Sequence, residues 1–135
     1  MDSLDPRIVA DTHPVGELAL SHLLLKRDRR VPWCLLVPRK AGLTEFHQMD
    51  RADRSQLMEE VSSLSAAIER GFGVDKINVA MLGNVVPQLH VHVVGRRRDD
   101  FAWPGPTMGV PGAEDYDDAG LAETLAVLRR ETGLG

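Results

Sequence analysis

Short apolar runs, separated by charged residues and proline, make up residues 20–38 of the chain. The run LSHLLLK at 20–26 and the run WCLLV at 33–37 have the length of strands, and the polar RDRR at 27–30 lies between them as a turn. Pro32 and Pro38 bound the second run, where proline does not interrupt the interior of a strand. The pattern therefore predicts two strands, close enough in sequence to form an antiparallel pair.

Two other segments lack a regular apolar period. Residues 1–17 contain Pro6, Pro14 and Gly16, which interrupt a helix, so this segment is expected to be extended chain and turns. Residues 96–112 carry several prolines and glycines in quick succession, WPGP among them. This second segment is expected to be an ordered loop without helix or strand.

The middle and the end of the chain show the period of amphipathic helices. Asp50 is a suitable N-cap, and the apolar positions that follow recur at steps of four, three and four residues: Leu57, Val61, Leu64 and Ile68. Gly71 and Gly73 end this pattern, and its apolar stripe is expected to lie in the core. A second helix is predicted after Asp118, where the apolar residues at helical spacing are Leu121, Leu125 and Leu128.

Two more strand-like runs, at 76–82 and 88–94, complete the pattern. Strands outnumber helices and short connections favour antiparallel pairing, so the expected class is α+β. We predict an antiparallel sheet of about five strands with a helix on one face and a C-terminal helix. Residues 1–135 are expected to form one domain, in which residues 101–135 are a loop and the C-terminal helix.

Composition and charge exclude several classes of protein. The formal charge of −4 argues against a general nucleic-acid binder, which carries a basic excess. Cys34 is the single cysteine, so no internal disulfide can form, and its apolar neighbours favour a buried position. No apolar run is long enough to span a membrane, and the acidic N-terminus lacks the features of a signal peptide. We therefore expect a soluble, cytoplasmic protein that binds neither nucleic acid nor membrane.

The candidate chemistry is concentrated in the stretch QLHVHVV. On a strand, alternate side chains point to opposite faces, so Gln88, His90 and His92 are expected to share one face and the intervening apolar residues the other. Neutral imidazole is a nucleophile or general acid/base near neutral pH, and it is also the commonest metal ligand. Together with the amide of Asn84 and the arginines at 96–98, the two imidazoles suit a bound phosphate.

This stretch resembles the histidine triad motif, H-φ-H-φ-H-φ-φ, in which φ is hydrophobic; here Gln88 replaces the first histidine. The sequence INVAMLGNVVPQLHVHVVGR is similar to the strand–turn–strand block of that family, with Asn78 and Asn84 at the positions of two family amides. WCLLVPRKAGLTEFHQM resembles an earlier block, a hydrophobic strand that ends in proline and a basic residue. The resemblance covers roughly residues 15–100.

The resemblance implies a nucleotide hydrolase or nucleotidyl transferase. In the family, the middle histidine attacks the α-phosphorus of a nucleotide derivative and forms a nucleotidyl-histidine intermediate, which water then resolves. His90 holds the middle position, and His92 would donate a hydrogen bond to a phosphoryl oxygen. Asn84 would bond the α-phosphate or the bridging atom, and Asn78 would lie near the ribose or phosphate.

The resemblance also implies the partners of the protein. The substrate would be a small-molecule nucleotide derivative: a dinucleoside polyphosphate, a phosphoramidate or an acyl adenylate. No metal or other cofactor is required by this chemistry. A homodimer is the usual state of the family, and the long helix with its apolar stripe is a second reason to expect one.

The chain departs from the family pattern at the first triad position and before the earlier strand. Pro32 and Trp33 stand where many members carry Gly-His. Gln88 cannot titrate near neutral pH, which leaves two alternatives. If the first histidine assists the leaving group by proton transfer, this protein favours leaving groups that depart as stable anions. If that histidine only supplies a hydrogen bond, Gln88 replaces it.

Two other functions stay open at this point. A metal-binding module that uses His90 and His92 on one strand face needs at least a third protein ligand, and no motif supplies one. A nucleotide-binding protein without turnover would follow if the glutamine at position 88 has abolished the reaction. A metal assay on chelator-free protein identifies the first alternative, and binding without product release identifies the second.

Overall fold

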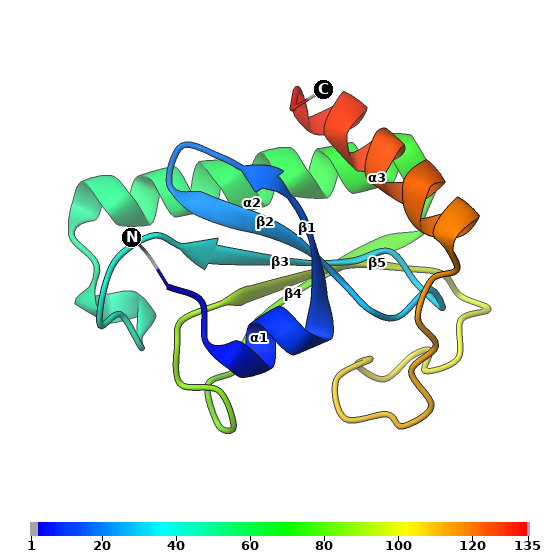
Figure 1. Cartoon of the computed structure of the whole chain (residues 1–135), viewed down its shortest axis with the longest axis horizontal. Coiled ribbons are helices and arrows are strands. Elements are labelled where there is room, and N and C mark those ends of the chain that lie inside the picture. Colours follow the sequence, from blue (N-terminus) through cyan, green and yellow to red (C-terminus); the bar gives the residue numbers. More distant parts are fainter. Residues whose placement is uncertain (1–2, 135) are drawn as a thin grey trace.

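Five antiparallel strands form the sheet at the centre of the molecule, with helices on both of its faces (Figure 1). The structure is a computed structural model and describes residues 3–134. Its elements in chain order are α1 (Pro6–Asp11), β1 (Thr12–Glu17), β2 (Ser21–Lys26), β3 (Trp33–Pro38), a 3₁₀ turn (Phe46–Gln48), α2 (Arg51–Phe72), β4 (Lys76–Met81), β5 (Val91–Arg96) and α3 (Asp118–Thr132). The strand order is β1-β2-β3-β5-β4. The predicted α+β class is confirmed, as is the antiparallel pairing of β2 with β3.

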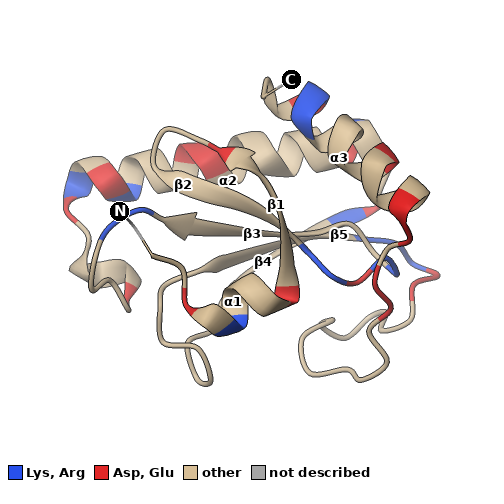
Figure 2. Ribbon diagram, viewed as in Figure 1, with Lys and Arg blue, Asp and Glu red and all other residues tan. Residues whose placement is uncertain are grey.

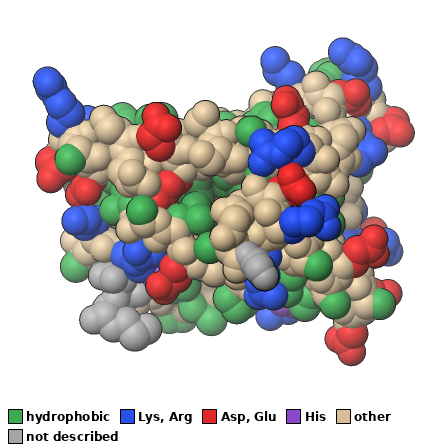
Figure 3. Space-filling view, turned by 90° about the horizontal axis from the view of Figure 1, so that it is seen from above, with side chains coloured by type: hydrophobic (Ala, Val, Ile, Leu, Met, Phe, Trp, Pro, Cys, Tyr) green, Lys and Arg blue, Asp and Glu red, His purple; other side chains and the backbone are tan. Residues whose placement is uncertain are grey.

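Helices α2 and α3 cover one face of the sheet (Figure 1). The predicted stripe of α2 is buried against alternate residues of the strands, and Leu57, Leu64 and Ile68 are at most 1% exposed. Gly95 of β5 lies directly under the helix: a Cβ built there would stand 2.8 Å from a side-chain carbon of Ile68, so glycine is needed for this close approach. Figure 3 views the molecule from this side, where acidic and basic side chains are interspersed and histidine is nearly absent.

The ends of both long helices follow the predicted signals. Asp50 caps α2 by accepting a hydrogen bond from a backbone N–H of the first turn, and Asp117 caps α3 in the same way. Gly73 ends α2 and Gly133 ends α3, both in the left-handed conformation with φ of 63° and 76°. Gly71 lies inside α2 and does not end it.

The opposite face of the sheet is covered by α1 and by loops (Figure 1). Trp33 and Leu35 of β3, Val94 of β5 and Ile8 of α1 belong to the apolar cluster on this side. His92 pairs with Leu35 across the β3–β5 ladder, so its side chain lies on this face, among apolar neighbours.

The prediction of extended chain and turns for residues 1–17 is wrong for Pro6–Asp11, which form helix α1, whereas Thr12–Glu17 are extended and form β1. Pro6 lies in the first turn of α1, where its fixed φ suits a helix and its missing N–H has no partner to lose. Asp5 is the N-cap and accepts from a backbone N–H of that turn. Pro14 lies in β1, an edge strand, beside an irregularity in the register with β2.

Strand β5 begins later than the predicted run at 88–94. The backbone N–H of Leu89 donates to the carbonyl of Leu43 at 3.0 Å, so the chain before Val91 bonds to a loop and not to a neighbouring strand. Leu89 still packs into the core on the α2 side. Gln88 and His90 therefore lie just before the strand and not on it.

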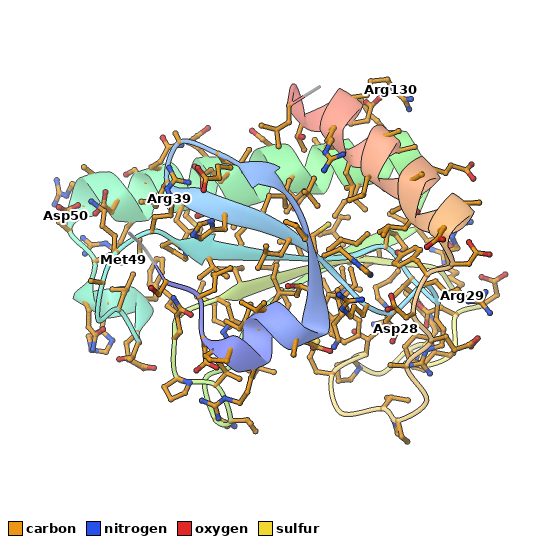
Figure 4. All side chains as sticks on the ribbon, viewed as in Figure 1. Asp28, Arg29, Arg39, Met49, Asp50 and Arg130 are labelled. Atoms are coloured by element: carbon orange, nitrogen blue, oxygen red, sulfur yellow. The ribbon has the colours of Figure 1, made fainter. Side chains whose placement is uncertain are left out.

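A loop without helix or strand was predicted at 96–112 and is observed at 97–117, since Arg96 ends β5. Its far end is tied to the turn between β2 and β3, where the N–H of Arg29 donates to the carbonyl of Glu114 at 2.7 Å. The Asp28 carboxylate, 1% exposed, accepts from the guanidinium of Arg30. Figure 4 shows Asp28 and Arg29 at this junction, which holds the long loop against the sheet.

Charged residues lie mainly on the helices and on the connecting loops, and the central strands carry few of them (Figure 2). Among residues 3–134, no helix has both the length and the apolar character to cross a membrane. The polar residues that are buried on the strands include Thr12, Ser21, His92 and Arg96, and a further buried histidine, His90, lies just before β5.

Candidate active site

His90 is held by a backbone carbonyl immediately before β5. Its side chain is almost wholly buried, and its Nδ1 lies 2.7 Å from the carbonyl oxygen of Gln88. A carbonyl oxygen only accepts hydrogen bonds, so Nδ1 carries the ring proton and Nε2 keeps its lone pair. The bond therefore fixes both the tautomer and the orientation of the ring, with Nε2 available as a nucleophile.

His92 on β5 has the opposite hydrogen-bond arrangement. The indole N–H of Trp33 donates to Nδ1 of His92 at 3.0 Å, so the proton of the neutral ring lies on Nε2. Burial lowers the pKa of His92 to about 4, and the charge of Lys26 acts in the same direction. The ring of His92 is therefore neutral at pH 7 and presents an N–H donor.

The two imidazoles form one chemical unit. Their ring centroids lie 5.0 Å apart in an edge-to-face arrangement. One ring offers a lone pair at Nε2 and its neighbour offers a neutral N–H. A displacement at phosphorus needs both groups, because one nitrogen attacks while a donor stabilises the charge on a phosphoryl oxygen.

The side chain of Gln88 bonds to the N-terminal part of the chain. Its Oε1 accepts from the backbone N–H of Asp5 at 2.7 Å, and its Nε2 donates to the carbonyl of Ser3 at 3.1 Å. Both alternatives raised by the sequence concern a bond from position 88 to the substrate. In the structure, the amide of Gln88 bonds to the backbone of the protein itself.

The two asparagines suggested by the sequence have different surroundings. Asn84 is exposed in the loop between β4 and β5. Asn78 lies on β4 opposite Val94, and its Oδ1 accepts from the guanidinium of Arg96 at 2.7 Å. Asn78 shares the face of His92 but stands two positions further along the sheet, a distance of about 7 Å.

The three arginines that follow the histidines bond to other parts of the protein. Arg96 is 1% exposed, and its guanidinium donates to the carboxylate of Asp100 at 2.7 Å. This bond lowers the pKa of Asp100 to about 2. Arg97 donates to a backbone carbonyl at the end of α2, and Arg98 lies 3.9 Å from an acidic side chain. Their proximity in sequence to the histidines does not place these arginines beside His90.

A cavity of about 270 Å³ adjoins His90. Its walls come from the 3₁₀ turn, the end of β4 and the residues before β5. The apolar members are Phe46, Met81, Leu82 and Leu89, and the polar members besides His90 are Thr44, Glu45, His47 and Gln88. The sequence places the 3₁₀ turn in the family's earlier block but does not predict that it lines the site, because more than 40 residues separate it from the histidines.

Sequence reasoning identified Trp33 only as a departure from the family pattern. The signal that could have found its role is the alternation along β3, which places Trp33 and Leu35 on the face that also holds His92. A buried indole N–H needs an acceptor, and an imidazole nitrogen on the neighbouring strand supplies one.

A metal ion has few ligands at this site. Among residues 3–134, no group of three or more His, Cys, Asp or Glu side chains is arranged to hold one. His90 and His92 each use Nδ1 in a hydrogen bond, so each has one nitrogen left. Catalytic zinc sites use three protein ligands and structural sites four. The metal-binding alternative therefore lacks a third ligand within the part of the chain that the structure describes.

Comparison with known proteins gives consistent matches. Residues 7–99 match the sequence model of the HIT domain. Three solved structures, each of a histidine triad protein, are similar over nearly the whole chain. That from Bradyrhizobium japonicum has 42% identity, covers 96% of this chain and 97% of its own, and has a TM-score of 0.94. That from Marinobacter aquaeolei has 41% identity, coverage of 98% and 97%, and a TM-score of 0.96. That from Sinorhizobium meliloti has 37% identity, coverage of 96% and 96%, and a TM-score of 0.94. A comparison with curated proteins finds no match.

Proposed function

Because the chain belongs to the histidine triad family, we propose that it is a nucleotide hydrolase or nucleotidyl transferase in which His90 is the nucleophile. The lone pair on Nε2 attacks the α-phosphorus of the substrate, and a phosphorus–nitrogen bond forms. The bond from phosphorus to the leaving group breaks, and its electron pair departs with that group. Water then attacks the same phosphorus, which releases a nucleoside monophosphate and a proton and returns the lone pair to Nε2. In a transferase, another acceptor takes the place of water.

The observation that carries this proposal is the 2.7 Å bond between Nδ1 of His90 and the carbonyl of Gln88. It keeps the proton away from the attacking nitrogen. When phosphorus bonds to Nε2, the ring becomes cationic, and a hydrogen bond from a cationic donor is stronger than one from a neutral donor. The same carbonyl therefore favours both the nucleophile and the covalent intermediate.

His92 would supply the donor for a phosphoryl oxygen. Its proton is on Nε2 because Trp33 occupies Nδ1, and it is neutral because its pKa is about 4. A neutral donor does not have to lose or gain a proton between pH 5 and pH 8 in order to act. Removal of one such donor costs about 10²- to 10³-fold in rate in comparable sites.

The two asparagines would complete the contacts to the nucleotide. Asn84 stands exposed in the loop that leads to His90, so its amide would bond the α-phosphate or the bridging atom. The Oδ1 of Asn78 is bonded to Arg96, which leaves the amide nitrogen for a ribose or phosphate oxygen. The substrate classes that suit this chemistry are dinucleoside polyphosphates, phosphoramidates and acyl adenylates.

A homodimer is also proposed, although not through the helix. The apolar stripe of α2 is buried in the core, so it is not available as a contact surface. Strand β4 is an edge of the sheet; Val79 and Met81 on it are 46% and 38% exposed, and Leu82 directly after it is 44% exposed. An apolar edge strand is a template for pairing with another chain. Light scattering at micromolar concentration should give twice the monomer mass of 14.9 kDa, and a monomer mass would contradict the proposal.

The test of the reaction is a panel of adenosine and guanosine derivatives from the three substrate classes, assayed for release of nucleoside monophosphate. The wild-type protein should release it from at least one class. His90→Ala should lower that rate by about 10³-fold or more and keep its circular dichroism spectrum. His13→Gln is the matched control, because His13 bonds Asp115 and does not line the His90 cavity. A near-wild-type rate for His90→Ala would overturn the assignment, and binding without release would indicate a nucleotide-binding protein without turnover.

A further inference from the structure

Three hydrogen bonds join the N-terminal segment, residues 3–7, to the loop that leads into β5. Two of them use the amide of Gln88, which accepts from the N–H of Asp5 and donates to the carbonyl of Ser3. The third runs from the guanidinium of Arg7 to a loop carbonyl at 2.9 Å. Residues about 80 positions apart in sequence are thus fastened together directly beside the candidate nucleophile.

The two hydrogen bonds of the Gln88 side chain to the N-terminal segment, here called the clamp, require an amide at position 88. A primary amide has an acceptor and a donor on one planar group, and the carbonyl of Ser3 and the N–H of Asp5 complement them. A carboxylate has no donor for the carbonyl. In an imidazole the two nitrogens point in divergent directions, so one ring does not reach both backbone groups in the same way. Glutamine at this position is therefore matched to the N-terminal segment.

The N-terminal segment lines part of a second cavity of about 580 Å³. Residues 3–6, Pro38, residues 40–44 and Gln88 line it. Gln88 and Thr44 also line the smaller cavity that contains His90, so the two cavities adjoin at these side chains. The larger cavity has the size of known small-molecule sites, whereas the smaller one is below that range.

The walls of the larger cavity suit an uncharged ring. Its apolar lining residues are Leu4, Pro6, Pro38, Ala41 and Leu43. The two charged side chains that line it, Asp5 and Lys40, are paired with Arg7 and Asp53 at 2.9 and 3.3 Å. A polyphosphate would need unpaired cations, and the described walls offer none. An apolar or aromatic group needs only the surface that the leucines and prolines provide.

We propose that Gln88 is a positioning residue that fastens the N-terminal segment, and that the cavity formed in this way receives the uncharged, ring-bearing part of the substrate while His90 reacts in the adjoining cavity. The inference rests on the proposed function for the identity of the reacting group. Two parts of a substrate have the required chemistry: the base of the nucleotide and an organic leaving group.

Four phosphoramidates distinguish these two sources. They combine an adenosine 5′-phosphate or a ribose 5-phosphate with either a benzylamine or a methylamine leaving group. The compounds are titrated by calorimetry into His90→Ala protein with Gln88 intact, with Gln88→Ala and with Gln88→Glu, so that binding is measured without turnover. The kcat and KM values are measured in parallel with His90 intact. Gln56→Ala is the matched control, because Gln56 bonds Glu60 on α2, on the other side of the sheet.

Gln88→Ala and Gln88→Glu should weaken binding of the compounds that carry adenine or a benzyl group by about 10-fold. This is the effect of losing one or two hydrogen bonds that order the N-terminal segment, and KM should rise more than kcat falls. Loss of the preference for benzylamine over methylamine assigns the cavity to the leaving group. Loss of the preference for adenosine over ribose assigns it to the base. Preferences that stay as in the wild type, or a fall in kcat alone that is equal for all four compounds, would overturn the proposal.

Hydrogen exchange measures the clamp without any ligand. The amide of Asp5 should exchange about 10-fold faster in Gln88→Ala than in the wild type, and at the wild-type rate in Gln56→Ala. Unchanged exchange in Gln88→Ala would also overturn the proposal. If the wild-type protein releases no nucleoside monophosphate from any compound, the proposed reaction fails. The calorimetric preferences and the exchange rates then still decide the role of Gln88.

Discussion

The two faces of the sheet receive alternate residues of the same strand, β5, but they depend on different interactions. Toward α2, Val91 and Val93 are completely buried among aliphatic side chains, and Gly95 admits the helix at close range. Toward α1, His92 lies among apolar neighbours and accepts a hydrogen bond from Trp33. Both faces carry a buried apolar cluster, but the second also holds a buried polar pair, in which Trp33 donates a hydrogen bond to His92.

Because of this difference, we expect substitutions on one face to change mainly the stability of the fold and substitutions on the other to change mainly the protonation of the site. An aliphatic core tolerates changes that conserve its volume, because no single partner is required. A buried polar pair does not, since the loss of one partner leaves the other unsatisfied. Substitutions toward α2 should therefore change the free energy of unfolding and leave the chemistry intact. Substitutions around His92 should change tautomers, pH dependence and rate.

The largest expected effect lies on the α2 face. Leu64→Ala removes a side chain that is 1% exposed and should lower the free energy of unfolding by about 2 to 5 kcal/mol in urea titrations. Ser63→Ala is the control, because Ser63 directly precedes Leu64 on α2 but is exposed. It should change the free energy of unfolding by less than about 0.5 kcal/mol. The kcat of folded Leu64→Ala should equal that of the wild type. A large fall in kcat under conditions where this variant is folded would show that the two faces are not separable.

The next effect is the dependence of stability on pH. The pKa of His92 is about 4 in the folded protein and about 6.5 when unfolded, so the unfolded state takes up the proton first as the pH falls. The neutral His92 therefore contributes to the free energy of unfolding above pH 6.5. This contribution, about 3 kcal/mol in total, is lost progressively as the pH falls to 4. His92→Gln keeps an acceptor for the indole N–H of Trp33 but has no group that titrates here. Its free energy of unfolding should therefore change less between pH 6.5 and pH 4 than that of the wild type.

Below pH 4 both proteins should lose stability together. The pKa of Asp100, lowered to about 2 by its bond to Arg96, produces this second decline. Unfolding titrations at a series of pH values measure both windows. Equal slopes for the wild type and His92→Gln between pH 6.5 and pH 4 would contradict a buried, neutral His92.

A smaller effect is expected at the indole. Trp33→Phe keeps the ring against His92 but removes the N–H that fixes its tautomer, so kcat should fall by about 10-fold with little change in KM. Nitrogen NMR of the imidazole should show the proton of His92 on Nε2 in the wild type and distributed over both nitrogens in the variant. A purely structural role for Trp33 would lower stability but leave the tautomer and kcat as they were.

The sequence predicted the α2 face well because its signals are local. The cap at Asp50 and the stripe from Leu57 to Ile68 act within one helix, and their period does not depend on distant residues. The opposite face was harder to predict. Pro6 indicated a break where it in fact begins α1, because proline suits the first turn of a helix as well as a turn. Only tertiary structure shows that Leu89 bonds a loop, and that β5 therefore starts after His90.

In the site, too, the features with a local sequence pattern were predicted and those that depend on long-range contacts were not. The alternation of QLHVHVV indicated the two histidines, and the assignment of His90 as the nucleophile by the family pattern stays a prediction. The bonds from His92 to Trp33 and from Gln88 to the N-terminal segment join residues 59 and more positions apart. No short-range pattern encodes such pairs, so the tautomer of His92 and the clamp at position 88 required the structure.

The most direct test of the account is the covalent intermediate on His90. The wild-type protein is mixed with a substrate from the active class, quenched at high pH to preserve the phosphorus–nitrogen bond, and digested for mass spectrometry. The account predicts an added nucleoside monophosphate on the peptide that contains His90, with fragment ions that place it on that residue. His92→Gln should retain the adduct and His90→Ala should lack it. An adduct on another residue, or steady turnover by His90→Ala, would contradict the central claim.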